Sequence, residues 1–286
     1  MPIFSFFVAN PGAWVGACAV LGLIVGSFLN VVIYRLPGIL ERDWEAQCRE
    51  LLDLPPAGAG KQPYGLVVPR SFCPACDYRI PAWQNIPVLS YLLLGGRCYA
   101  CRSRIPVRYP LVELAGGAVA ALAAWRFGFG GEALLAALFG WSLLCLAVID
   151  LKHRLLPDVI TLPLLWLGLA VNLGGVFAGL DAAVKGAIGG YLVLWLLFHA
   201  FRLCTGKEGM GYGDFKLLAA TGAWLGWQSL PPVLFLAALL GSLAGVAIAL
   251  RNRFWDRDMQ MPFGPFLALA GWVALLWGEG IRWTGM

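Results

Sequence analysis

Long apolar runs separated by short polar segments make up most of this chain of 286 residues. An α-helix needs about 20 apolar residues to cross a bilayer. Eight runs approach that length and cover roughly residues 12–34, 110–127, 131–150, 158–178, 183–203, 214–229, 232–250 and 262–281. The sixth run is short and the second contains a Gly-Gly pair. The pattern predicts an all-α polytopic membrane protein with about eight transmembrane helices.

The composition supports this prediction. Sixty per cent of the residues are hydrophobic and 13% are charged, whereas about a quarter of the residues of soluble domains are charged. An ordinary soluble domain is therefore excluded. The N-terminal segment MPIFSFFVAN has no basic n-region and no small-residue cleavage site, so the first run is expected to be a retained helix.

The distribution of basic residues predicts the orientation. Of the 21 Lys and Arg residues, all except Arg126, Lys185 and Arg282 fall in segments on one side of the predicted bundle. Basic residues concentrate on the cytoplasmic side, which places the N-terminus outside and residues 35–108 in the cytoplasm. We expect a first helix over residues 1–34, a cytoplasmic domain over 35–108 and a helical core over 109–286. No basic stretch interleaved with aromatics suggests a nucleic-acid partner.

The start of the cytoplasmic segment has a helical period of its own. Leu40, Trp44, Cys48 and Leu51 recur every three or four residues, which predicts an amphipathic helix over residues 39–53. This helix could lie on the membrane surface or pack on the rest of the cytoplasmic domain.

Two CxxC pairs, Cys73/Cys76 and Cys98/Cys101, lie in the same segment, with 21 residues between them. Two such pairs supply the four thiolates of a tetrahedral metal site. The predicted cytoplasmic location disfavours disulfides, and Zn²⁺ is the preferred ion because it favours this ligand set. Four thiolates leave no open coordination position, so the role would be structural. An iron–sulfur cluster or two unrelated redox pairs are the alternatives.

Carboxylates are few in the apolar runs. Asp150 ends the third run and Asp214 begins the sixth. Two membrane crossings separate them, so both acids are expected at the cytoplasmic face. Acids at such positions are costly and often functional. Two neighbouring carboxyls in a poorly solvated site share a proton, so that one activates water while the other hydrogen-bonds a carbonyl. Nearby, Gly211 and Gly213 would let backbone approach a substrate or adopt left-handed conformations.

Simpler roles for the two acids stay open at this point. Asp150 could be an interfacial anchor paired with the basic residues at 152–154, and Asp214 could pair with Lys216 or cap its helix. A proton relay in a transporter is another possibility, although it predicts acids at different depths in the membrane. A zinc-module adaptor with a passive anchor would not need seven further helices.

Several segments together resemble a known family over nearly the whole chain. They are GSFLNVVIYRLP (26–37), the four cysteines, NIPVLSYLLLGGRC (85–98), IPVRYPLVE (105–113), IDLKHRLLPDVITLP (149–163) and GMGYGDFKLLAATGAWLG (209–226). In this order they resemble the bacterial type IV prepilin peptidases, which are bifunctional leader peptidase/N-methyltransferases of the GxGD membrane protease type. The related presenilins and preflagellin peptidases are expected to lack the tetracysteine domain.

The resemblance implies the following function. Asp150 and Asp214 would be the catalytic aspartates of a multi-pass enzyme of the bacterial inner membrane. The substrates would be type IV prepilins or type II secretion pseudopilins, cut on the cytoplasmic side after a Gly that ends a short basic leader. The new N-terminus would then be methylated from S-adenosyl-L-methionine. No GxGxxG follows a soluble strand, so the residues that bind this cofactor stay unassigned, with the cytoplasmic domain as the candidate region.

Overall fold

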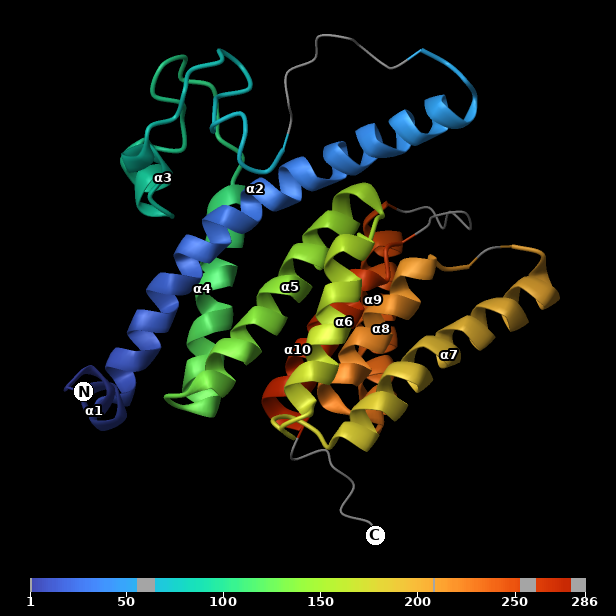
Figure 1. Cartoon of the computed structure of the whole chain (residues 1–286). Coiled ribbons are helices and arrows are strands. Elements are labelled where there is room, and N and C mark those ends of the chain that lie inside the picture. Colours follow the sequence, from blue (N-terminus) through green and yellow to red (C-terminus); the bar gives the residue numbers. More distant parts are fainter. Residues whose placement is uncertain (1, 56–64, 208, 253–260, 279–286) are drawn as a thin grey trace. The chain divides into compact units, whose positions relative to one another are not determined.

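The computed structural model describes residues 2–55, 65–207, 209–252 and 261–278, and these residues are predominantly helical (Figure 1). The helices are α1 (Pro2–Ala9), α2 (Pro11–Leu51), α3 (Leu89–Leu93), α4 (Arg108–Phe127), α5 (Gly131–His153), α6 (Asp158–Asn172), α7 (Leu180–Thr205), α8 (Tyr212–Leu225), α9 (Leu230–Asn252) and α10 (Gly264–Trp277), with 3₁₀ turns η1 (Ala82–Asn85) and η2 (Trp227–Ser229). Within the described ranges, β structure is limited to two isolated bridges. The predicted all-α class is confirmed.

Each of the eight predicted apolar runs contains one helix, but the helices differ in length. Among the described residues, five segments are long and apolar enough to cross a membrane: α2, α4, α5, α7 and Trp227–Arg251, which covers most of α9. Helices α6 and α10 are apolar but shorter. Helix α8 has 14 residues and is about 21 Å long, against about 30 Å for the hydrocarbon core. The end of the eighth predicted run and Arg282 lie outside the described residues.

The chain forms two compact units, Met1–Ala137 and Leu138–Met286. In the first unit, α2 packs lengthwise against α4 (Figure 1). A Cβ on Gly22 would lie 2.8 Å from the Gly117 Cα, and a Cβ on Gly26 would lie 2.7 Å from the Glu113 Cα. The backbones therefore approach as closely as glycine allows, as is common in membrane helix pairs. The Gly-Gly pair of the second run is thus a packing surface and does not interrupt the helix.

Helix α2 differs from the prediction in one respect. It continues without interruption from the apolar run through Pro37 to Leu51, so the helix predicted over 39–53 is present but is not separate. A proline inside a helix removes one backbone hydrogen bond. Here Pro37 is buried, and the helix persists across the missing bond.

The second unit is built around its shortest helix. All residues of α8 from Asp214 to Trp224 except Lys216 are buried, because α8 packs against α6, α7, α9 and α10. A Cβ on Gly190 of α7 would lie 2.7 Å from the Leu218 carbonyl oxygen, so glycine at this position lets α7 and α8 pack closely. Neighbouring helices therefore surround α8, which explains how so short a helix is accommodated.

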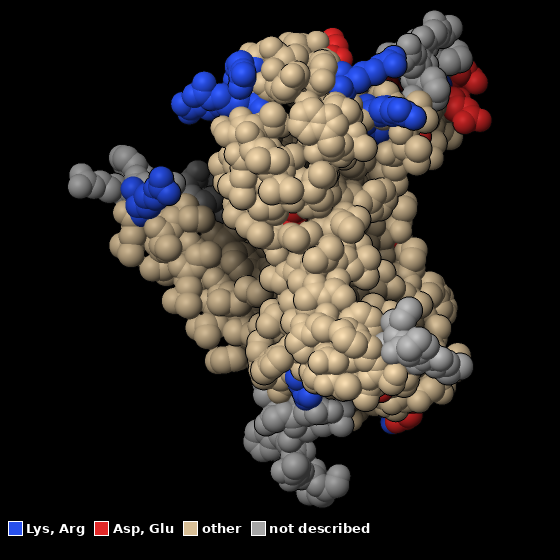
Figure 2. Space-filling view, turned by 90° about the vertical axis from the view of Figure 1, so that its left-hand side faces the viewer, with Lys and Arg blue, Asp and Glu red and all other residues tan. Residues whose placement is uncertain are grey.

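The outer surfaces of the helices carry many large apolar side chains. Val20, Ile24 and Phe28 on α2 are more than half exposed, as are Leu196 and Leu197 on α7. Figure 2 shows mostly uncharged side chains on the face drawn, with most of the visible charged side chains toward its edges. Such a surface is compatible with hydrocarbon as the surrounding solvent.

Candidate active site and metal centre

Asp150 lies in the last turn of α5 and is buried, with 6% of its surface exposed. The backbone N–H of Gly264, the first residue of α10, donates a hydrogen bond of 3.1 Å to its Oδ2 atom. A Cβ on Gly264 would lie only 2.5 Å from that oxygen. The start of α10 therefore needs glycine to hold this carboxyl in place.

Asp214 is the third residue of α8 and is equally buried. Its backbone N–H donates to the Gly211 carbonyl at 3.2 Å. Within the described residues, its Oδ1 atom is buried and has no hydrogen-bond partner. Asp150 lies close enough to act on Asp214 electrostatically. Buried polar atoms without a partner are rare in native proteins, so this oxygen is a candidate for contact with a reacting molecule.

Leu156 packs beside both acids. It is buried in the segment between α5 and α6. A Cβ on Gly213, next to Asp214, would lie 2.7 Å from the Leu156 Cβ, and a Cβ on Gly264 would lie 3.2 Å from its Cδ1. One side chain therefore contacts the two glycine positions that flank the acids. Sequence reasoning missed both Leu156 and Gly264. The only signal in the sequence is the Gly-Pro that begins the last apolar run.

The glycines near Asp214 have ordinary backbone conformations. None of Gly209, Gly211 and Gly213 has a positive φ angle. Gly213 allows the close approach of Leu156, while a Cβ on Gly211 would meet no atom within 4 Å. Of the two uses expected for these glycines, the geometry supports close packing at Gly213. It does not show the left-handed conformation.

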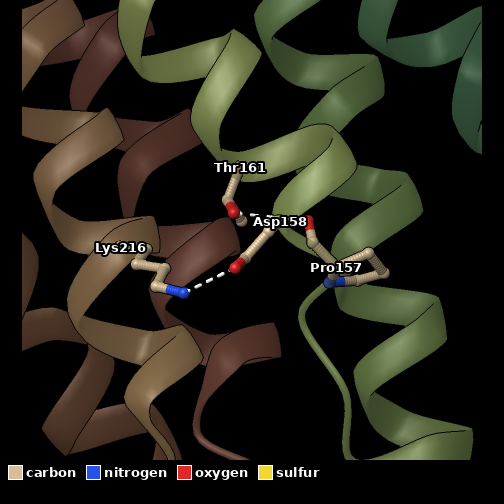
Figure 3. Close-up of polar contacts among 4 residues, drawn as sticks. All are labelled: Pro157, Asp158, Thr161 and Lys216. Carbon is tan, nitrogen blue, oxygen red and sulfur yellow. Dashed lines mark hydrogen bonds and ion pairs between the residues drawn. The ribbon is translucent and has the colours of Figure 1, made fainter. Parts of the chain in front are cut away.

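Lys216 has a different partner from the one considered for it. Its Nζ lies 2.7 Å from both carboxylate oxygens of Asp158, the first residue of α6 (Figure 3). In the same turn, the Thr161 hydroxyl donates to the Pro157 carbonyl. The ion pair links the start of α6 to the start of α8. The interpretation of Asp214 as an anchor paired with Lys216 is therefore not supported.

The four cysteines converge on one point, as predicted. Their sulfurs all lie within 4.8 Å of one another, and the Cys73 and Cys101 sulfurs are 3.8 Å apart. Thiolates about 2.3 Å from a tetrahedral ion are separated by about 3.8 Å, whereas disulfide sulfurs lie about 2.05 Å apart. All four thiols are free. The arrangement therefore fits a metal ion bound by all four sulfurs.

Each half of the cluster is one copy of an internal repeat. The segments CPACDYRIP (73–81) and CYACRSRIP (98–106) form equivalent hydrogen bonds: Cys73 N to Tyr78 O and Cys98 N to Ser103 O, at 2.9 and 2.8 Å. The residue after each second cysteine has a positive φ angle, 55° at Asp77 and 60° at Arg102. The repeat is visible in the sequence, and sequence reasoning missed it.

Ser103 stabilises one thiolate of the cluster. The Cys101 sulfur lies 3.1 Å from the Ser103 hydroxyl oxygen. Hydrogen bonding with the side chain and backbone of Ser103 lowers the pKa of the Cys101 thiol to about 6. A thiolate is the form that binds metal, and four neighbouring thiolates repel one another unless a cation lies between them.

Comparison with known proteins matches two family profiles to this chain, one within each of its two compact units for most of its length. The profile of the Bacterial Peptidase A24 N-terminal domain matches residues 20–127, and that of the Type IV leader peptidase family matches residues 137–246. This chain belongs to the type IV leader peptidase family. The family resemblance inferred from the sequence is confirmed.

Relatives of this leader peptidase align along almost their entire length. A protein of Stutzerimonas stutzeri is 53% identical over 97% of this chain and 95% of its own length. One of Pseudomonas aeruginosa is 52% identical over 99% and 97%, and one of Aeromonas hydrophila is 55% identical over 91% and 90%. Each is named prepilin leader peptidase/N-methyltransferase. No solved structure matches significantly.

Proposed function

We propose that this chain is an intramembrane aspartic endopeptidase that removes the leader peptide of type IV prepilins or type II secretion pseudopilins. The observation that carries this proposal is the pair of buried carboxyls, with the Oδ1 atom of Asp214 left without a hydrogen-bond partner in the described structure. The relatives' printed names supply the substrate class and a second, methyltransferase activity.

The pair performs hydrolysis through complementary protonation states. The ionised carboxyl takes a proton from water as the water oxygen bonds to the peptide carbonyl carbon. The protonated carboxyl gives its proton to the carbonyl oxygen. In the second step the carboxyl that took the proton from water gives it to the nitrogen, and the C–N bond breaks. The other carboxyl, now ionised, takes a hydroxyl proton as the carbonyl re-forms, which restores the starting protonation of the pair. The titration belongs to the pair. Gly264 fixes one carboxyl by its hydrogen bond. Gly211 precedes α8 and Gly213 lies in its first turn, so the expected supporting loop at the other carboxyl is in part the start of a helix.

The positive-inside bias supports a cytoplasmic location for the reaction, in the inner membrane of a bacterium. Asp150 lies in the last turn of α5 and Asp214 in the first turn of α8, with α6 and α7 between them. An even number of crossings returns the chain to the face from which it left. The scissile bond, after a Gly that ends a basic leader, would lie at this face.

The four cysteines fit a structural Zn²⁺ ion. Their spacing supports a closed tetrahedral site made entirely of thiolates. This would stabilise a cytoplasmic domain that contains only short helical segments between residues 65 and 107.

The methyltransferase activity follows cleavage in this proposal. The new N-terminal amine, once deprotonated, bonds through its nitrogen lone pair to the methyl carbon of S-adenosylmethionine as the S–C bond breaks. The products are a methylated ammonium group, S-adenosylhomocysteine and one released proton. Transfer of a labelled methyl group to a cleaved prepilin by the purified chain tests this step, and cleavage without transfer would contradict it.

Substitution of the acids tests the protease. Asp150→Asn and Asp214→Asn are each expected to abolish cleavage of a prepilin in detergent or proteoliposomes, while the melting temperature stays near that of the wild type. Asp181→Asn is the matched control, because Asp181 is an exposed acid paired with Lys185 on α7. Full activity in either of the first two variants would end the aspartyl proposal.

A further inference from the structure

The first unit contains a cavity of about 310 Å³ between α2, the tetracysteine region and the start of α4. This is the lower end of the volume range of ligand pockets, about 300–1,000 Å³. The cavity belongs wholly to residues 27–113. It is therefore distinct from Asp150 and Asp214, which lie in the second unit.

Aromatic rings and polar groups both line this cavity. The aromatic residues are Tyr34, Phe72, Tyr78, Tyr91, Tyr99 and Tyr109. Among the polar residues are Gln84 and Glu113, together with Arg104 and Arg108. The lining thus offers π faces, an amide, a carboxylate and guanidinium groups around one cavity that is open to solvent.

Gln84 lines the cavity and has a side-chain amide nitrogen without a hydrogen-bond partner in the described structure. It is 8% exposed, and its Nε2 atom is buried and has no hydrogen-bond partner within the described structure. An unsatisfied buried donor destabilises the folded protein. A bound molecule with an acceptor at this point would remove that cost.

A hydrogen bond holds the carboxylate of Glu113, another residue that lines the cavity, in place. Its Oε2 atom accepts a hydrogen bond of 2.7 Å from the backbone N–H of Val88. Val88 has a φ angle of 60°, which is strained for a β-branched residue. Strain of this kind is often retained at ligand sites, and here it accompanies the fixed orientation of a carboxylate that lines the cavity.

We propose that this cavity is the S-adenosylmethionine site. The inference deepens the proposed methyltransferase activity and rests on it. The Gln84 amide would pair with the adenine edge, a pairing that Gln side chains make bidentately. Tyrosine faces attract cations such as the sulfonium. Glu113 would accept from the ribose hydroxyls or the ammonium group, and Arg104 or Arg108 would bind the carboxylate.

Residues of the tetracysteine cluster also line this cavity. Cys73 and Cys98, the first cysteine of each pair, line the cavity, and Ser103 lies on it as well. Ser103 also contacts the Cys73 and Cys101 sulfurs. Loss of the metal would therefore disturb the cavity as well as the fold of the cytoplasmic domain.

Direct binding tests this site. Tritiated S-adenosylmethionine is equilibrated with the full-length purified protein, and bound ligand is measured without any methyl acceptor. Gln84→Leu, which keeps the volume and removes the amide, and Glu113→Gln, which keeps the Val88 hydrogen bond and removes the charge, are each expected to weaken binding about tenfold or more. Glu41→Gln is the control, because it removes an exposed carboxylate from α2 outside the cavity.

The outcomes separate this inference from the proposed function. Wild-type affinity in both cavity variants would overturn the assignment of the site, while no binding or methyl transfer by the wild-type protein would overturn the methyltransferase proposal itself. Zinc content reports whether each variant retains the folded module. Ultraviolet cross-linking of the tritiated ligand to the wild-type protein adds a test without mutation. Label within residues 27–113 supports the site, and label confined to residues 138–286 contradicts it.

Discussion

Lys216 of α8 and Asp158 of α6 are 58 residues apart in sequence and form a bidentate ion pair, with both Nζ–O distances at 2.7 Å (Figure 3). Lys216 is two residues from Asp214, and Asp158 is two residues from Leu156, which packs against Gly213. The side chains are 28% and 53% exposed. Pairs this exposed contribute little to stability. The pair's main effect is therefore on the position of α8 relative to α6.

The first prediction concerns this pair. Asp158→Asn and Lys216→Gln are each expected to lower the kcat of prepilin cleavage by about threefold to tenfold, which corresponds to about 0.7–1.4 kcal/mol in the activation barrier. The melting temperature should change little. The charge-swapped double variant, Asp158→Lys with Lys216→Asp, should recover part of the loss.

The equivalent neutral substitutions at Asp181 and Lys185 are the control, since this exposed pair lies within α7 alone. Equal losses at both pairs, or no recovery in the swapped variant, would contradict a positioning role for the pair between α6 and α8.

The second prediction concerns Gly264. Gly264→Ala would place a methyl group against the Asp150 carboxylate, so α10 or the acid must move. Cleavage is expected to fall at least about 100-fold, because small displacements of catalytic groups cost about this much. Gly278→Ala, at the other end of α10, meets no atom within 4 Å and should cleave at the wild-type rate. Comparable activity in the two variants would show that Asp150 tolerates displacement.

The helical class, the eight apolar segments and the convergence of the cysteines could all be predicted, because each depends on a local pattern or a spacing. Gly264 and Leu156 could not, since their importance arises from contacts between segments far apart in sequence. The pairing of Lys216 with Asp158 was missed for the same reason. Asp214 lies closer than Asp158 to Lys216 in the sequence. Only the packing of α6 against α8 shows that Asp158 is the acid that pairs with Lys216. The continuation of α2 through Pro37 reflects the context of the whole helix, which local proline preferences do not capture.

The third prediction separates two glycines that the sequence treats alike. Gly213→Ala would bring a Cβ to 2.7 Å from the Leu156 Cβ, whereas Gly211→Ala meets nothing within 4 Å and keeps an extended backbone at a φ angle of −83°. Gly213→Ala is expected to lower the melting temperature and cleavage together. Gly211→Ala should leave the melting temperature unchanged, so any loss of cleavage in that variant would measure how closely the substrate approaches the loop. Identical melting temperatures for the two variants would argue against the packing described for Leu156.

The last prediction concerns the metal centre. Metal analysis of the purified protein should find about one zinc per chain, because a closed set of four thiolates binds this ion tightly. Cys76→Ser is expected to lose the zinc and to expose residues 65–107 to limited proteolysis, since this region has little helix to hold it together. Cys48→Ser, which removes an exposed thiol from α2, should keep both zinc and protection. Less than about half an equivalent of zinc in the wild-type protein, with no iron, would refute the site, whereas iron with little zinc would identify an iron–sulfur cluster in its place.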